Sequence, residues 1–170
     1  MFYTLKLAIQ LPAVTRDITV SVSDGTNPIA SASVTAGSVS GTTGDDGEVT
    51  LTGVSESVDS ITVTKAGYAD KTESVTIDES HTSFTITLDV LDTITITVDD
   101  GEDTPTPIEG ATVTIGSVTK TTDSSGECTF PDMTYQDYSA EISATGYITK
   151  TETIAFRSNH KSFTVSLEAE

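Results

Sequence analysis

The sequence predicts an all-β protein made of two tandem β-sandwich domains that are preceded by one further strand. Apolar residues occur in short runs in which they alternate with Thr and Ser, as in half-buried strands. Gly, Asp and Pro stand between these runs, where the chain has to turn. The chain also repeats itself at a nearly constant offset, which indicates two copies of one structural unit.

The repeat divides the chain into its two domains. At an offset of 79 residues, Pro28 aligns with Pro107, and similar matches continue to the end of the chain. Before the prolines the offset is 76 residues, because Ile18 aligns with Ile94. The second copy therefore has three extra residues in its first loop, which marks this loop as an exposed turn. The predicted domains are residues 17–90 and 91–170.

Each copy contains enough alternating runs for a complete sandwich. Ile18, Val20 and Val22 alternate with Thr and Ser, so they lie on one face of a first strand. About seven short strands per copy are expected, as in an immunoglobulin-like sandwich. After the first strand, the clearest runs in the first copy are Ala32–Ala36, Val49–Leu51, Ile61–Val63, Ser74–Ile77 and Phe84–Leu88.

The second copy carries a family pattern in four segments, Pro107–Val113, Thr122–Phe130, Tyr138–Ile142 and Ala144–Tyr147. This pattern resembles the carboxypeptidase regulatory-like repeats, and the resemblance extends from about residue 17 to residue 168. It implies a transthyretin-like (prealbumin-like) Greek-key sandwich, shared with the collagen-adhesin B-type domains. The first copy departs from the pattern at Ser31, where the family prefers Gly.

The resemblance implies a fold more strongly than a function, because such domains serve as spacers, stalks and binding modules. Some collagen-adhesin relatives carry a Lys–Asn isopeptide bond that starts from a lysine on the first strand. The first strands here hold Ile, Thr, Val and Ser and no lysine, so this crosslink is not expected. The join Leu88–Asp92 lacks a Gly-rich or Pro-rich spacer, which predicts a short rod.

Composition excludes several classes of function. A net charge of −18 repels nucleic acids and anionic membrane surfaces. Cys128 is the single cysteine, so an internal disulfide is excluded, and the alternation around it predicts a buried strand residue. No apolar run is long enough to cross a bilayer, and the N-terminus lacks the basic region and cleavage site of a signal peptide. We expect no cofactor, no metal site and no catalytic residues.

Some side chains remain candidates for binding. The acidic runs Gly44–Glu48 and Asp99–Asp103 could supply calcium ligands, but Asp-Gly pairs are also common in hairpin turns, which is the interpretation we favour. His81 and His160 occupy equivalent loops and are expected to be solvated. Tyr135 and Tyr138 have no aromatic counterpart in the first copy, so they are the candidates for a surface that binds a partner or stacks on a carbohydrate. Ordinary packing of the two rings is the alternative, and it is the interpretation we favour.

Residues 1–16 are not explained by the repeat. Four apolar residues alternate there with more polar ones, which predicts a strand with one apolar face that Pro12 ends. Such a strand needs a partner, so it folds back on the first domain or pairs with another protein. We favour a role in partner docking or oligomerisation for its apolar side chains, Leu5, Leu7, Ile9 and Leu11.

These features together predict a non-enzymatic structural protein of a surface. The leading hypothesis is a decoration or fibre protein on the virion of a tailed virus, anchored by residues 1–16 to other structural proteins. The alternative is a cell-surface adhesin, or an accessory module that binds carbohydrate or protein, of a bacterium or archaeon. A homo-oligomer and a glycan or protein of a host surface are the further partners considered. The expected location is the virion surface or, in the alternative, the extracellular surface of a cell.

Overall fold

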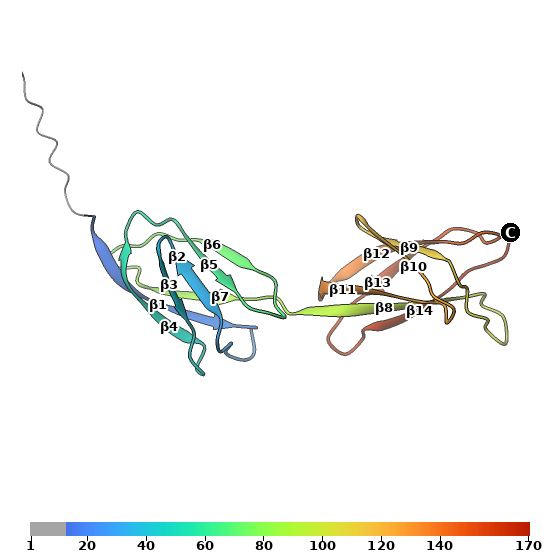
Figure 1. Ribbon diagram of the computed structural model, residues 1–170, viewed down its shortest axis with the longest axis horizontal. Helices are drawn as coiled ribbons and strands as arrows, with labels where there is room; N and C mark the ends of the chain where they lie inside the picture. Colours follow the sequence, from blue (N-terminus) through green and yellow to red (C-terminus); the bar gives the residue numbers. More distant parts are fainter. Residues whose placement is uncertain (1–12) are drawn as a thin grey trace, which may run out of the picture. The chain divides into compact units, whose positions relative to one another are not determined.

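The computed structural model describes residues 13–170, which contain fourteen strands and no helix. The chain divides into one compact unit that ends at Leu88 and a second that begins at Asp89 and also includes Gly67–Ala69. Each unit is a sandwich of a three-stranded and a four-stranded sheet (Figure 1). The predicted class, two all-β sandwich domains, is therefore confirmed. The strand predicted around Leu5 to Leu11 lies outside the described residues.

The first domain contains β1 to β7. Its three-stranded sheet has the order β4-β1-β7, in which β1 is antiparallel to β4 and parallel to β7. Its four-stranded sheet is antiparallel and has the order β3-β2-β5-β6. The strands are β1 (Thr15–Ser23), β2 (Ser33–Ala36), β3 (Val39–Thr42), β4 (Glu48–Ser55), β5 (Ser60–Thr64), β6 (Lys71–Ser74) and β7 (Ser83–Thr87).

The second domain repeats this topology with β8 to β14. The sheet orders are β11-β8-β14 and β10-β9-β12-β13, and β14 again lies parallel to the first strand of its domain. The strands are β8 (Leu91–Asp99), β9 (Thr112–Ile115), β10 (Val118–Thr121), β11 (Glu127–Thr134), β12 (Asp137–Ser143), β13 (Lys150–Ala155) and β14 (Ser162–Ser166).

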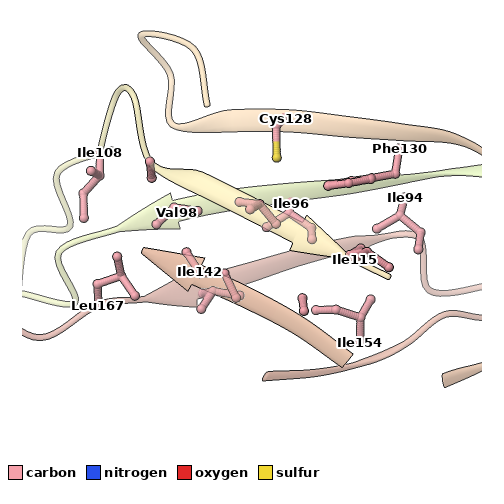
Figure 2. Packing of buried hydrophobic residues seen from close by; sticks show 14 of the residues in the cluster. Ile94, Ile96, Val98, Ile108, Ile115, Cys128, Phe130, Ile142, Ile154 and Leu167 are labelled. Atoms are coloured by element: carbon pink, nitrogen blue, oxygen red, sulfur yellow. The ribbon is translucent and has the colours of Figure 1, made fainter. Parts of the chain in front are cut away.

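Each sandwich buries the apolar side of its alternating strands. In β8, Ile94, Ile96 and Val98 are fully buried, while the Thr residues between them lie on the outer face. Figure 2 shows these side chains between the two sheets, opposite Ile115 and Ile142 of the four-stranded sheet. A fully buried side chain of this size contributes about 1.5–3 kcal/mol through the hydrophobic effect. Burial of one face thus holds the two sheets of each domain together.

One strand of the first domain lies earlier than the sequence predicts. The expected run Ser74–Ile77 is not a strand beyond Ser74, and β6 occupies Lys71–Ser74 instead. Ile77 is nevertheless buried, with 2% of its surface exposed. The apolar alternation thus predicted the burial of Ile77 correctly. It did not predict that the strand ends at Ser74, three residues before this buried side chain.

A buried threonine fixes the loop before the second strand of each domain. In the first domain, Thr43 Oγ1 donates a hydrogen bond to the carbonyl of Ile29 (2.7 Å) and accepts one from the amide of Ala32 (2.9 Å). Thr122 makes the corresponding bonds in the second domain, to Ile108 (2.6 Å) and from Ala111 (2.9 Å). Each threonine is only 4% exposed. The hydroxyl therefore satisfies two backbone groups that water cannot reach.

Ser31, where the first copy departs from the family pattern, adopts a backbone conformation that favours glycine. Ser31 has a φ of +56°, in the left-handed region, where its counterpart Gly110 has a φ of +77°. A side chain in this region costs about 1–2 kcal/mol, which glycine avoids. A Cβ built on Gly110 meets no atom within 4 Å. The two positions therefore differ in backbone strain and not in packing.

We expect Ser31→Gly to stabilise the first domain and Gly110→Ser to destabilise the second. The net change in each case is about 0.5–1 kcal/mol, because the greater freedom of glycine in the unfolded chain offsets part of the relief. Hydrogen exchange of the full chain, followed on peptides from each domain, measures both effects. Equal signs for the two substitutions would contradict this account of the backbone.

Candidate functional site

The candidate Tyr135 belongs to a polar cluster at the start of β8. Its hydroxyl donates a 2.7 Å hydrogen bond to Oδ2 of Asp92, and Lys161 Nζ forms an ion pair with the same oxygen. The tyrosine ring packs on Phe156 with 5.1 Å between the ring centroids. The β11–β12 turn, β8 and the loop before β14 are thus joined at one point. These contacts hold Tyr135 within the second domain.

The cluster holds its acid and its base in their charged forms. The hydrogen bonds from Lys161, Tyr135 and the amide of Thr93 lower the pKa of Asp92 to about 2. The carboxylate in turn raises the pKa of Lys161. Both side chains are therefore charged at neutral pH and form an ion pair.

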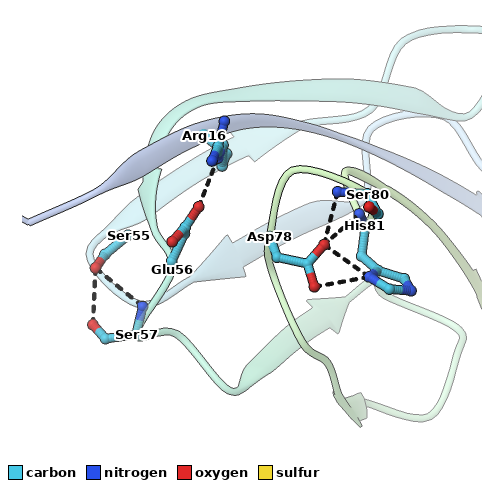
Figure 3. A network of polar contacts seen from close by, with 7 residues as sticks. All are labelled: Arg16, Ser55, Glu56, Ser57, Asp78, Ser80 and His81. Atoms are coloured by element: carbon cyan, nitrogen blue, oxygen red, sulfur yellow. Dashed lines mark hydrogen bonds and ion pairs between the residues drawn. The ribbon is translucent and has the colours of Figure 1, made fainter.

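The first domain has a different ion pair at the aligned positions. Arg16 aligns with Asp92 and Glu56 with Tyr135, and Arg16 Nε lies 2.6 Å from Glu56 Oε1 (Figure 3). Both domains therefore tie the start of the first strand to the turn that follows β4 or β11. The residue types differ while the connection is kept, which favours a structural role for this position.

We expect Asp92→Asn to destabilise the second domain by about 1 kcal/mol at pH 7, the usual value for a partly exposed charged pair. A carboxyl group with a lowered pKa stabilises the fold above its ordinary pKa of 3.8 and loses this effect as the pH falls toward 2. Unfolding of both proteins as a function of pH measures the difference, which should close between pH 4 and pH 2. A difference that stays constant over this interval would refute the assignment.

Tyr138 is bonded within its own turn. Its hydroxyl donates to the carbonyl of Thr134 (3.0 Å) and accepts a hydrogen bond from Gln136 Nε2 (2.9 Å). Tyr138 is half-buried, as is Tyr135. The structure thus places both candidates at the β11–β12 turn and gives each hydroxyl an intramolecular partner. A role in binding a partner remains a prediction for the two rings.

The acidic runs use their carboxylates to hold turns. Asp46 Oδ1 accepts a hydrogen bond from the amide of Glu48 (3.0 Å). Asp100 Oδ1 accepts bonds from the amides of Thr106 (2.9 Å) and Glu102 (3.3 Å), which lower the pKa of Asp100. Across residues 13–170, no group of three or more His, Cys, Asp or Glu side chains is arranged to hold a metal ion.

The two histidines and the cysteine contact other side chains or lie buried within their domains. His81 Nδ1 lies 2.8 Å from Asp78 Oδ1 in the turn before β7 (Figure 3). The ring of His160 packs against the ring of Phe163, with 4.3 Å between the ring centroids. Cys128 is 6% exposed, and burial raises the pKa of its thiol to about 11. The thiol is thus protonated at neutral pH and a poor nucleophile.

Sequence reasoning located neither the buried threonines nor the Asp92–Lys161 pair. A signal for Thr43 and Thr122 does exist, because they align at the offset of the repeat. The Asp92–Lys161 pair has no such signal, since its members stand 69 positions apart and the aligned residues of the first copy, Arg16 and Thr82, are of other types. Within the described part of the chain, no helix is long and apolar enough to cross a membrane.

The second domain matches a known family. Residues 93–168 match the carboxypeptidase regulatory-like domain. This match lies within the second domain, and it confirms the resemblance predicted from the sequence motifs of that domain. No curated protein matches the chain.

Solved structures with a similar fold include bacterial pilins. The shaft pilin spaA from Lactobacillus rhamnosus GG is 13% identical over 92% of this chain and 98% of its own, with a TM-score of 0.44. The minor pilin GBS52 of Streptococcus agalactiae is likewise 13% identical, over 92% of this chain and 97% of its own, with a TM-score of 0.44. The Bacillus anthracis TIE protein is 19% identical over 92% of this chain, with a TM-score of 0.44, and this chain spans 34% of its length. At these identities the similarity concerns the fold alone.

Proposed function

We propose that this chain is a non-enzymatic structural module of an extracellular surface, in which two sandwich domains act as spacers or adhesive units. The observation that carries the proposal is that the positions shared by both repeats serve the fold. Thr43 and Thr122 satisfy buried backbone groups, and Gly47 and Gly126 allow close backbone contacts. A spacer requires stable domains. The buried threonines and the two glycines support the same fold in both repeats.

The residues that differ between the repeats support the same proposal. Asp92, Lys161 and Tyr135 form one intramolecular cluster, and the Cys128 thiol is buried and protonated. Catalysis would need a nucleophile, acid or base that is available to a substrate. The family match of the second domain adds that such domains occur as stalks and binding modules on surfaces. A bacterial or archaeal cell surface is the location we propose, since nothing in the comparisons favours a virion.

Immunogold labelling of the source organism tests this proposal, with an antibody raised against the purified full chain. We expect label on the outside of intact cells, and loss of that label after brief protease treatment of the cells. Label confined to the cytoplasm would refute a surface role. Label on released particles and not on cells would restore the virion hypothesis. Turnover in a hydrolase screen that one point substitution abolishes would refute the non-enzymatic assignment.

A further inference from the structure

The outer edge of β14 differs from the other sheet edges of the second domain. An open edge invites pairing with another strand, and proteins usually block it with charges, proline or a bulge. The edge strand β10 carries Lys120, and β13 carries Lys150 and Glu152. The edge strand β11 contains Pro131 and an irregular register. In contrast, β14 (Ser162–Ser166) has no charge, proline, glycine or register shift.

The backbone of β14 is available for pairing on this side. The amide of Thr95 donates to the carbonyl of Lys161, and the amide of Leu167 donates to the carbonyl of Asp99. Since backbone groups alternate along a strand, those of Ser162, Thr164 and Ser166 point away from β8. In residues 13–170, β14 pairs with no strand other than β8. One outward carbonyl, that of Ser166, accepts a 3.4 Å hydrogen bond from Lys150 Nζ.

A groove lies beside this edge. It has a volume of about 230 Å³ and is formed by the beginning of β13 and the end of β14. Ile148 is the apolar residue of its lining and is 52% exposed, so its side chain is open to contact from outside the domain. The other lining residues are polar or charged: Thr149, Lys150, Ser166 and Glu168. A strand added to the edge of β14 would lie beside this groove, and every second side chain of that strand would point to the same face. The site therefore offers an extended segment a row of outward backbone groups beside one exposed apolar side chain.

The first domain lacks part of this arrangement. Its β7 (Ser83–Thr87) is also uncharged and lies parallel to β1. However, Ala69 stands where the second domain has Ile148, so the apolar contact at the groove is missing. The edge of β14 is thus the better acceptor, and β7 provides a matched control.

The chain itself contains a segment with the required chemistry. In the sequence of residues 4–11, the apolar residues Leu5, Leu7, Ile9 and Leu11 alternate with Thr4, Lys6, Ala8 and Gln10, so an extended conformation would place the two sets on opposite faces. Residues 1–12 include one lysine and no acidic residue, whereas the chain as a whole carries −18. Eight residues are more than enough to cover a five-residue edge strand. Alternation, charge and length together favour this segment over an unrelated peptide as the occupant.

We propose that residues 4–11 of one copy pair with the edge of β14 in a second copy, with their apolar side chains directed toward the groove at Ile148. Backbone hydrogen bonds supply affinity in this mode, and the alternating side chains supply specificity. The donor and the acceptor are different surfaces, so the contact is head-to-tail and repeats from copy to copy. The inference deepens the proposed structural role by naming the partner as the chain itself.

Two variants of the full chain separate donor from acceptor. Leu7→Asp with Ile9→Asp places charges on the apolar face of the donor segment. Thr164→Pro removes an outward amide of β14 without removing a hydrogen bond to β8. We expect the wild-type chain to form larger species with increasing concentration in sedimentation velocity, and each variant to remain monomeric. A mixture of the two variants should form a dimer of twice the mass of one chain and nothing larger.

Further variants keep the test independent of folding. Ile148→Asp changes an exposed side chain and should also abolish association, while Thr85→Pro, at the equivalent position of β7, should not. Hydrogen exchange at Thr164 and Ser166 should slow when the wild-type chain associates. A wild-type chain that stays monomeric at high concentration overturns the proposal, and so does association that persists in the donor variant. Slow exchange at β14 in a monomer would mean that the segment folds back on its own chain, which also overturns it. None of these results depends on the surface location tested by immunogold labelling.

Discussion

Gly126→Ala is expected to destabilise the second domain by about 3–5 kcal/mol, because backbone strain and a steric clash add at this position. Gly126 has a φ of +73°, which side chains rarely adopt. A Cβ would lie 2.5 Å from the carbonyl oxygen of Val98 and 2.9 Å from Cβ of Pro107. Neither neighbour can move freely, since the amide of Ile108 donates to that same carbonyl at 2.9 Å.

Two further substitutions separate strain from clash. Gly146 has a φ of +84° but no atom within 4 Å of a Cβ, so Gly146→Ala should cost only about 1–2 kcal/mol. Gly47→Ala should reproduce the full effect in the first domain, since its Cβ would lie 2.6 Å from the carbonyl oxygen of Val22. Calorimetry and domain-resolved hydrogen exchange of the full chain measure the three losses. Similar losses for Gly126→Ala and Gly146→Ala would show that the clash contributes nothing.

The core residues of each domain could be predicted from the sequence, because apolar residues at alternate positions of a strand are the ones that become buried. Ile94, Ile96 and Val98 of β8 are all buried as this alternation predicts. Strands that bury few side chains have no such alternation and could not be predicted. Every residue of β10 is exposed, and pairing with β9 alone defines it as a strand. Its counterpart β3, whose residues are at most half-buried, was also absent from the predicted runs.

The candidate site was less predictable than the fold. The lack of an aromatic counterpart marked Tyr135 as a candidate, but it gave no sign that the hydroxyl bonds to Asp92, 43 residues earlier in the chain. Such a contact depends on how the β11–β12 turn is placed over β8, and no local pattern encodes it. Repeat comparison identified the position as different, but the structure was needed to identify its partner.

Thr122→Val is the other substitution with a large expected effect. Valine has nearly the same shape as threonine and keeps the apolar contacts, but it removes the hydroxyl. The carbonyl of Ile108 and the amide of Ala111 each lose their bond to this hydroxyl, at a site where the side chain is 4% exposed. A buried polar group without a partner costs about 1–3 kcal/mol. We expect the second domain to lose about 2–4 kcal/mol of its free energy of unfolding.

Matched substitutions isolate the role of the hydroxyl. Thr122→Ser keeps it and should cost only about 1 kcal/mol for the lost methyl group. Thr114→Val makes the same chemical change on the outer face, where the hydroxyl bonds only to Thr119 Oγ1 at 3.0 Å, and should change stability by less than about 0.5 kcal/mol. Thr43→Val should act on the first domain as Thr122→Val acts on the second.

The measurement is again domain-resolved hydrogen exchange of the full chain, with calorimetry as an independent check. If Thr122→Val and Thr114→Val proved equally mild, the buried hydroxyl would not hold the loop between Ile108 and Ala111. If Thr122→Val unfolded both domains together, the two sandwiches would not be separate units of stability. The expected result is a loss confined to the domain that carries the substitution, since each hydroxyl bonds only to backbone groups of its own sandwich.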